Sequence, residues 1–282
     1  MTEFFDAVMR HDFMLYALLT GILASVACGV VGTYVVVRRI TYIAGGIAHS
    51  VLGGMGLAYY LKVAYDISWL QPLHGAVVAA LASAVTIALV GFYFKEREDT
   101  VIGAIWAIGM AVGIIFISRT PGYNENLMSY LFGNILMVSL GDLWLIAALD
   151  ALVILVGFLF HKQIAAVCFD EEFARVRGIN VQFYHLLLLC LTALTVVILT
   201  TVVGIVMVIA FLTLPVAVAG FFSSKLWQIM IIAIGLSILL MTFGLGISYG
   251  PDLPAGATII ILAGAVYLIV TVVSVLMKLK KS

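Results

Sequence analysis

Long apolar runs separated by short polar segments make up most of the chain. Nine of these runs approach the roughly 20 residues that a helix needs to cross a bilayer. Because the runs are continuous rather than alternating, they predict an all-α polytopic membrane protein and not a β-barrel. We expect one transmembrane domain over residues 1–282, with eight spans as the alternative if one segment is re-entrant. The predicted spans are 14–37, 40–61, 73–94, 101–117, 143–160, 183–201, 204–222, 226–249 and 255–277.

The sixth and seventh predicted spans form one uninterrupted apolar run. A single helix over both would be roughly 60 Å long, about twice the thickness of the hydrocarbon layer. The chain must therefore turn back or break near residues 200–204. Pro215 lies inside the seventh span and predicts a kink or a half-helix there.

Composition supports the membrane assignment and excludes several classes of protein. The chain is 65% hydrophobic and 10% charged, with a mean hydropathy of +1.24, whereas soluble domains carry about 25% charged residues. Lys plus Arg and Asp plus Glu both total 14, so a basic nucleic-acid surface is not expected. Cys28, Cys168 and Cys190 give no even, closely spaced set, and we expect no disulfide framework.

The basic residues predict the orientation of the chain in the membrane. Lys and Arg are enriched on the cytoplasmic side of membrane proteins. If the N-terminus lies outside, eleven of the 14 basic residues fall in the cytoplasm. This distribution favours nine crossings and a cytoplasmic C-terminus. Acidic residues rather than a basic region precede the first run, so a cleaved signal peptide is not expected.

His49 is the first candidate for function, because an ionisable group at membrane depth is costly and usually faces a cavity or a partner. Gly45, Gly53 and Gly56 share its helical face. This small-residue face leaves space that a ligand could use or another backbone could fill. Neutral imidazole is a common ligand of zinc-like cations. The alternative is a tightly packed helix in which the imidazole donates to a neighbouring carbonyl.

Acidic residues supply the other candidates for cation binding. Asp150 lies in the middle of the fifth span. It is either a cation or proton site or a carboxyl whose hydrogen bonds are satisfied by a neighbouring helix. Acids at an outer pore mouth concentrate cations, although ordinary solvated loop charge is the alternative for each one. Asp252 stands out among them, because the turn around it leads directly into the last span. The predicted outer acids are Asp66, Glu125, Asp142 and Asp252.

Two loops carry further patterns. Residues 127–138, outside, are apolar but short and predict a helix lying at the membrane interface. In residues 163–182, inside, acids precede bases and a glycine follows, which predicts a short capped helix. Phe169, Phe173 and Val176 share one face of that helix. This modest apolar face favours a helix that docks a soluble partner over a helix that lies on the membrane surface.

Enzyme motifs are absent from the sequence. It contains no zincin motif, nucleophile elbow, phosphate-binding loop with Lys-Ser/Thr or Cys-x-x-Cys. We expect no catalytic residues and no hydrolysis of ATP by this chain.

Several of these motifs, in order over most of the chain, resemble the permease subunit of metal-type ABC importers, the zinc/manganese/iron family. The Leu-Phe-Gly element at 131–133 resembles the zinc branch in particular. The matching pieces are Arg38–Arg39, residues 48–50 with 53–54, residues 127–133, the inner segment 170–178, residues 204–219 with Pro215, and residues 254–256.

The resemblance implies a type II ABC importer-like permease fold in a bacterial plasma membrane. It implies a homodimer with the pathway at its two-fold interface, two cytoplasmic ATPase subunits that bind ATP, and an extracytoplasmic metal-binding solute protein. No permanently bound cofactor is expected. Residues implied in ATPase coupling lie within the cytoplasmic segment 163–182: Asp170, Glu171, Phe173, Ala174, Arg177 and Gly178.

The resemblance also implies a role for His49 in the metal pathway. In the family an Asp usually precedes this His by one helical turn, and here that position is Gly45. One imidazole from each subunit is a poor divalent site, so either coordination is weak and transient or another acid such as Asp150 contributes. Zinc is the first choice of cargo, with manganese, iron or a chelated metal as alternatives. A stand-alone proton-coupled carrier is the alternative of another class, although the inverted repeat that it predicts is not apparent.

Overall fold

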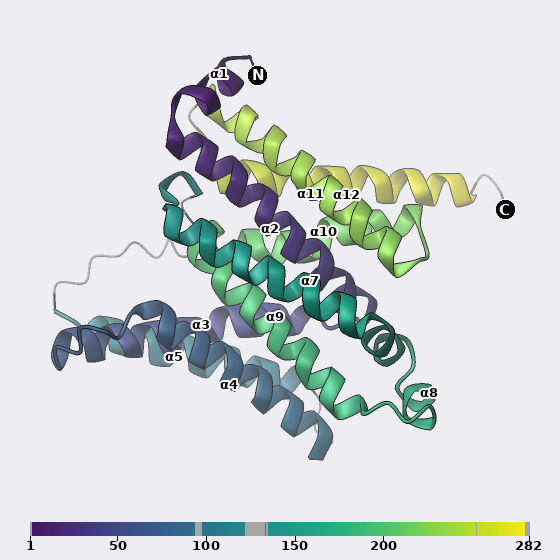
Figure 1. Cartoon of the computed structure of the whole chain (residues 1–282), viewed down its shortest axis with the longest axis horizontal. Helices are drawn as coiled ribbons and strands as arrows, with labels where there is room; N and C mark the ends of the chain where they lie inside the picture. Colours follow the sequence, from purple (N-terminus) through teal and green to yellow (C-terminus); the bar gives the residue numbers. More distant parts are fainter. Residues whose placement is uncertain (1, 94–97, 122–132, 134, 252, 280–282) are drawn as a thin grey trace.

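The computed structural model describes all residues except 1, 94–97, 122–132, 134, 252 and 280–282. The described residues form helices, turns and loops (Figure 1). The helices are α1 (Thr2–Arg10), α2 (Asp12–Val37), α3 (Thr41–Ala64), α4 (Pro72–Tyr93), α5 (Glu98–Arg119), the 3₁₀ helix η1 (Ile135–Met137), α7 (Leu140–Phe169), α8 (Glu171–Val176), α9 (Val181–Val203), α10 (Ile205–Phe222), α11 (Leu226–Tyr249) and α12 (Ala255–Leu279).

Nine of these helices correspond one to one with the nine predicted runs, which confirms the all-helical membrane class. Eight are long and apolar enough to cross a membrane. The ninth, α3, has 24 residues but is less apolar, because it carries five glycines, His49 and Lys62. The short N-terminal helix α1 is not predicted by the runs, since it is mostly amphipathic rather than continuously apolar.

The predicted turn between the sixth and seventh spans lies at Gly204. This residue separates α9 from α10 and has a φ of +84°, a conformation that glycine adopts without steric cost. Its N–H donates to the Thr200 carbonyl at 3.1 Å and so closes α9. The half-helix predicted at Pro215 is wrong, because α10 continues without a break from Ile205 to Phe222.

The centre of the molecule is formed by α2 and α9. In their most apolar windows 61% and 72% of residues are buried, whereas in α5 and α12 only 11% are. Helices α7, α10 and α11 contact α2, while α3, α4 and α5 form a second group (Figure 1). This group joins the rest through contacts of α4 and α3 with α9 and of α3 with α10. The exposed faces of α5 and α12 are apolar and therefore suit lipid or another membrane-embedded chain.

The outer loop differs from its prediction where the structure describes it. Most of the predicted interfacial helix at 127–138, and the candidate Glu125, lie outside the described residues, and Ile135–Met137 form a 3₁₀ turn. Asp142 is part of a capping box with Ser139: its carboxylate accepts the Ser139 N–H at 2.9 Å, and Ser139 Oγ accepts the Asp142 N–H at 3.3 Å. This predicted outer acid therefore has a structural role at the start of α7.

Candidate functional site

His49 lies half-buried on α3 and stacks on an aromatic side chain of α5. The ring centroids of His49 and Trp106 are 4.3 Å apart and the rings are nearly parallel, at 6°. Trp106 is itself held, because its Nε1–H donates to Met110 Sδ at 3.1 Å. The indole therefore covers one face of the imidazole and fixes the plane in which both ring nitrogens lie.

The glycines near His49 differ in what lies beside them, either backbone of another helix or space without backbone. A Cβ at Gly53 would lie 2.7 Å from the Gly109 carbonyl oxygen, and one at Gly56 would lie 2.8 Å from that of Gly113. Backbone of α5 thus fills the space at these two positions. At Gly45 the nearest atom to an added Cβ would be Ile209 Cδ1, at 3.9 Å, an ordinary van der Waals distance, so backbone of α5 does not fill the position one turn before His49.

Asp150 is buried on α7, with 5% of its surface exposed. It lies beside Ala27 and Cys28 of α2, and its carboxylate interacts with the backbone of Ala27. Both sequence interpretations, a cation or proton site and a carboxyl satisfied by a neighbouring helix, therefore stay predictions. Within the described chain no group of three or more His, Cys, Asp or Glu side chains could hold a metal ion, so Asp150 and His49 do not form a joint site of that size.

Asp252 and Glu125 lie outside the described residues. Their predicted role at an outer mouth therefore stays a prediction.

The predicted inner helix is present as α8, and its caps follow the sequence pattern. Asp170 is the N-cap and accepts the Phe173 N–H at 3.0 Å. Gly178 ends the segment with a φ of +76°. Ala174 is fully buried and packs between Val167 of α7 and Val181 of α9, so this small residue is what brings α8 close to the bundle.

Arg38, at the end of α2, binds α8 through an ion pair that the local sequence pattern does not predict. Its guanidinium forms an ion pair with Glu171 and also donates to the Val167 carbonyl at 2.8 Å. The Arg38 side chain is only 10% exposed. A pair of arginines at the end of an apolar run, facing acids far along the chain, is the signal that could have suggested this contact.

The other side of α8 is exposed at Phe173 and Val176. Phe169, which the sequence places on the same helical face, is also exposed but is the last residue of α7, because the helix breaks at Asp170. Arg177 lies over the Phe173 ring, with 5.0 Å between its guanidinium carbon and the ring centroid. The helix therefore presents apolar and cationic surface together, outside the membrane-spanning runs.

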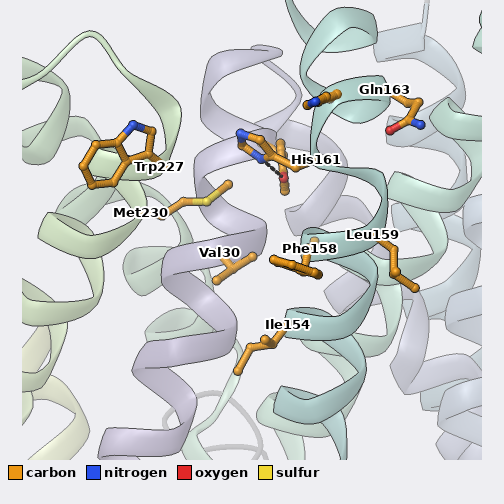
Figure 2. Close-up of a pocket in the computed structure, with 11 residues that line it drawn as sticks. Val30, Ile154, Phe158, Leu159, His161, Gln163, Trp227 and Met230 are labelled. Atoms are coloured by element: carbon orange, nitrogen blue, oxygen red, sulfur yellow. Dashed lines mark hydrogen bonds between the residues drawn. The ribbon is translucent and has the colours of Figure 1, made fainter.

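A second polar contact lies in a crevice between α2, α7 and α11, away from the predicted site residues (Figure 2). The Tyr34 hydroxyl and His161 Nδ1 are 2.8 Å apart. The crevice has a volume of about 640 Å³ and a mostly apolar lining, including Val30, Phe158 and Trp227. None of the predicted site residues lines it, so it is a separate feature of the molecule.

Known proteins resemble this chain over nearly its whole length. The family model described as the ABC 3 transport family matches residues 10–274. A Chlamydia pneumoniae protein named "Probable metal transport system membrane protein" is 43% identical over 266 residues, which cover 93% of this chain and 90% of the relative. The manganese transport system membrane protein MntC of Halalkalibacterium halodurans is 31% identical over 267 residues, covering 95% and 89%.

A solved structure has a fold similar to that of this chain. A chain in the structure of PsaBC from Streptococcus pneumoniae in complex with a Fab matches with a TM-score of 0.83 at 30% identity, covering 95% of this chain and 94% of the other. The resemblance to ABC importer permeases that the motifs predict is therefore confirmed, and the membrane role is not a catalytic one. The chain belongs to the ABC 3 transport family, whose members are the membrane-spanning permease subunits of ABC transporters.

Proposed function

We propose that two copies of this chain form the pathway of an importer that takes a divalent transition metal ion into the cytoplasm. The observation that carries the proposal is the family match over residues 10–274, together with relatives named for metal and manganese transport. Those names favour manganese as the cargo. Zinc, the first choice from sequence, is the second candidate, because the borderline-soft imidazole of His49 suits zinc well.

His49 of each copy is the proposed contact for the passing ion. The Trp106 stack fixes the plane of the imidazole, and Gly45 one helical turn away brings no side chain of its own into the space beside it. One imidazole from each subunit binds a divalent ion weakly. Weak binding suits conduction, because an ion that enters the pathway must also leave it.

Coupling to ATP is proposed to act through α8 and its neighbours in segment 163–182. The exposed Phe173 and Val176, next to Arg177, provide a surface for a cytoplasmic ATPase subunit. The ion pair of Arg38 with Glu171 would transmit movement of α8 to α2. A solute-binding protein would deliver the ion at the opposite face, where the N-terminus lies in the proposed orientation.

One observation favours the proton-coupled carrier, namely the ionisable side chain of Asp150 buried on α7. The two mechanisms differ in their energy source. Uptake that stops on ATP depletion while the proton gradient is maintained supports the importer, and uptake that continues supports the carrier.

The His49 role is tested by radioactive manganese and zinc uptake in cells that express the chain with its ATPase and binding protein. We expect His49→Ala to lower uptake at least about ten-fold, because loss of a metal ligand removes well over 1.4 kcal/mol of interaction. The matched control is His74→Ala at the start of α4, where Nδ1 accepts the Gln71 N–H at 3.1 Å. Wild-type uptake of both metals by His49→Ala, at equal expression, would contradict the proposed pathway.

A further inference from the structure

A polar pocket lies where the ends of α2 and α4 meet α8 and the start of α9. Its volume is about 580 Å³. It adjoins the contact between Arg38 and Glu171 but contains neither His49 nor the exposed face of α8. The residues that line it are Arg38, Gly91, Phe92, Glu171, Arg175, Ile179, Asn180, Val181, Gln182 and His185.

The charges in this pocket do not balance. Arg38 and Arg175 both reach the same carboxylate: Glu171 Oε1 pairs with Arg38, and Glu171 Oε2 lies 3.8 Å from Arg175 Nη2. Among the described residues that line the pocket, Glu171 is the single acid. Two guanidiniums and one carboxylate leave an excess of one positive charge, which repels a cation and attracts an anion. The planar guanidinium also matches the geometry of phosphate and carboxylate oxygens.

His185 provides a second, independent indication of an occupant. Its side chain is 3% exposed, and Nδ1 has no hydrogen-bond partner among the described residues. The ring is fixed by an edge-on contact with Phe92, with 5.2 Å between centroids. A buried polar nitrogen without a partner is costly. In the tautomer with the proton on Nδ1, the Nδ1–H would donate to an oxygen of an anionic ligand and so remove this cost.

The start of α9 adds to the positive potential. Asn180 caps this 23-residue helix by accepting the Phe183 N–H at 3.1 Å, and Asn180, Val181 and Gln182 line the pocket. The N-terminal end of a long helix carries partial positive charge and free N–H groups. The helix end, the two guanidiniums and the buried imidazole thus converge on one cavity.

We propose that this pocket binds an oxyanion of the phosphate class from the cytosol, held between Arg38, Arg175 and His185. The ligand would join α8 to α2 and α9 and hold α8 against the bundle. Phospholipid headgroups share this phosphate chemistry. The free oxyanion is the source that the site favours, because the lining is largely polar and lies where α8 leaves the bundle. Oxyanion binding does not depend on the proposed transport function, whereas an effect on ATPase coupling would.

Phosphate binding by the purified full-length chain, in lipid-free detergent and without the ATPase, tests the proposal. Thermal unfolding is followed during titration with inorganic phosphate, against sodium chloride at equal ionic strength. We expect saturable stabilisation by phosphate alone. Arg175→Gln should weaken the apparent affinity about ten-fold, whereas Arg177→Gln, the same charge change on the same segment, should not alter it, because Arg177 lies over Phe173 and does not line the pocket. Stabilisation that follows ionic strength only, or that both variants lose equally, would overturn the proposal.

Two further measurements address separate questions. The first asks whether the phosphate group comes from a free oxyanion or a lipid headgroup, and the second asks whether the ligand joins α8 to the bundle. In lipid nanodiscs of phosphatidylcholine, added phosphate should still stabilise the chain. Stabilisation seen solely with phosphatidylglycerol would assign the site to a lipid headgroup and overturn the free oxyanion. Hydrogen exchange of residues 171–178 should slow on addition of phosphate in the wild type and not in Arg175→Gln. Binding without this protection would contradict the bridge to α8.

Discussion

At the scale of single residues, the surroundings of His49 are set by Trp106. A lone imidazole on a glycine-rich face is compatible with several roles. A parallel stack at 4.3 Å, on an indole whose N–H is fixed by Met110, restricts the imidazole to one plane. Trp106 is 57 positions away in the sequence, and nothing in the local pattern around His49 points to it.

Trp106 is therefore expected to position His49 for the passing ion. Stacked aromatic pairs contribute about 0.5–1.5 kcal/mol beyond area burial, which corresponds to roughly two- to ten-fold in a rate or affinity. Trp106→Leu should lower the efficiency of metal uptake by about this factor, mainly through a higher KM, while Trp106→Phe keeps a stacking ring and most of the efficiency. Equal KM values for the wild type and Trp106→Leu, in uptake measured against metal concentration, would rule out the positioning role.

At the scale of helices, close packing between α3 and its neighbours depends on glycine. A Cβ at Gly109 of α5 would lie 2.5 Å from Ser50 Cα, and one at Gly54 of α3 would lie 2.1 Å from the Gly75 carbonyl oxygen of α4. Small residues let membrane helices approach at backbone distance, where packing and weak hydrogen bonds hold them. The polar pair of Ser50 and Ser83, whose Oγ atoms are 2.8 Å apart, adds a hydrogen bond between α3 and α4.

Gly109→Ala should destabilise the protein, because the added methyl group meets backbone that cannot rotate away. The expected loss is about 1–3 kcal/mol, the range for overpacking. Gly103→Ala on the same helix is the matched control, since nothing lies within 4 Å of its added Cβ. Thermal unfolding in detergent measures both, and equal midpoints for the two variants would show that the close α3–α5 contact is not maintained.

The anchoring of α8 can be tested in the same way. Glu171→Gln removes the charge that pairs with Arg38 and leaves a guanidinium that is only 10% exposed without its carboxylate. We expect looser attachment of α8 and a several-fold decrease in transport per ATP hydrolysed in the complete transporter. Glu172→Gln changes the same charge at an exposed neighbouring position and serves as the control. The prediction is wrong if both variants couple ATP hydrolysis to uptake as the wild type does.

At the scale of the whole molecule, the number of crossings decides which segments share a side of the membrane. Eight helices qualify by apolarity, and α3 is a ninth helix of sufficient length. If α3 crosses, Arg39 before it and Lys62 in its last turn lie on opposite sides of the membrane. Most of the residues that lower its apolarity make protein contacts: Gly46, Gly53 and Gly56 pack against α5, Gly54 packs against α4, and His49 stacks on Trp106. These contacts compensate for the weaker affinity of α3 for lipid.

Cysteine accessibility tests this topology. In a background without the native cysteines, Lys62→Cys should react with a membrane-impermeant maleimide added to intact cells. Lys225→Cys, before α11, should react only after permeabilisation, since nine crossings with the N-terminus outside place it in the cytoplasm. Protection of Lys62→Cys in intact cells, with labelling after permeabilisation, would mean that α3 does not cross or that the orientation is inverted.

The amino-acid sequence by itself determined the helical segments of this protein. In a bilayer, backbone N–H and C=O groups must bond within their own segment, so an apolar run of sufficient length becomes a helix whatever surrounds it. The turn at Gly204 and the caps of α8 are equally local, because they depend on glycine conformation and on side chains within a few residues. These features could be predicted, along with the family to which the motifs point.

Only the tertiary structure decided which helices meet. His49 stacks on Trp106, Arg38 pairs with Glu171, and Gly53 and Gly56 pack against α5 whereas Gly45 does not. These contacts join residues far apart in the sequence. Eight of the spans are similarly apolar, so hydropathy carries little information on which faces come together. Shape complementarity at close range selects the partners, and it depends on the side chains of both helices at once.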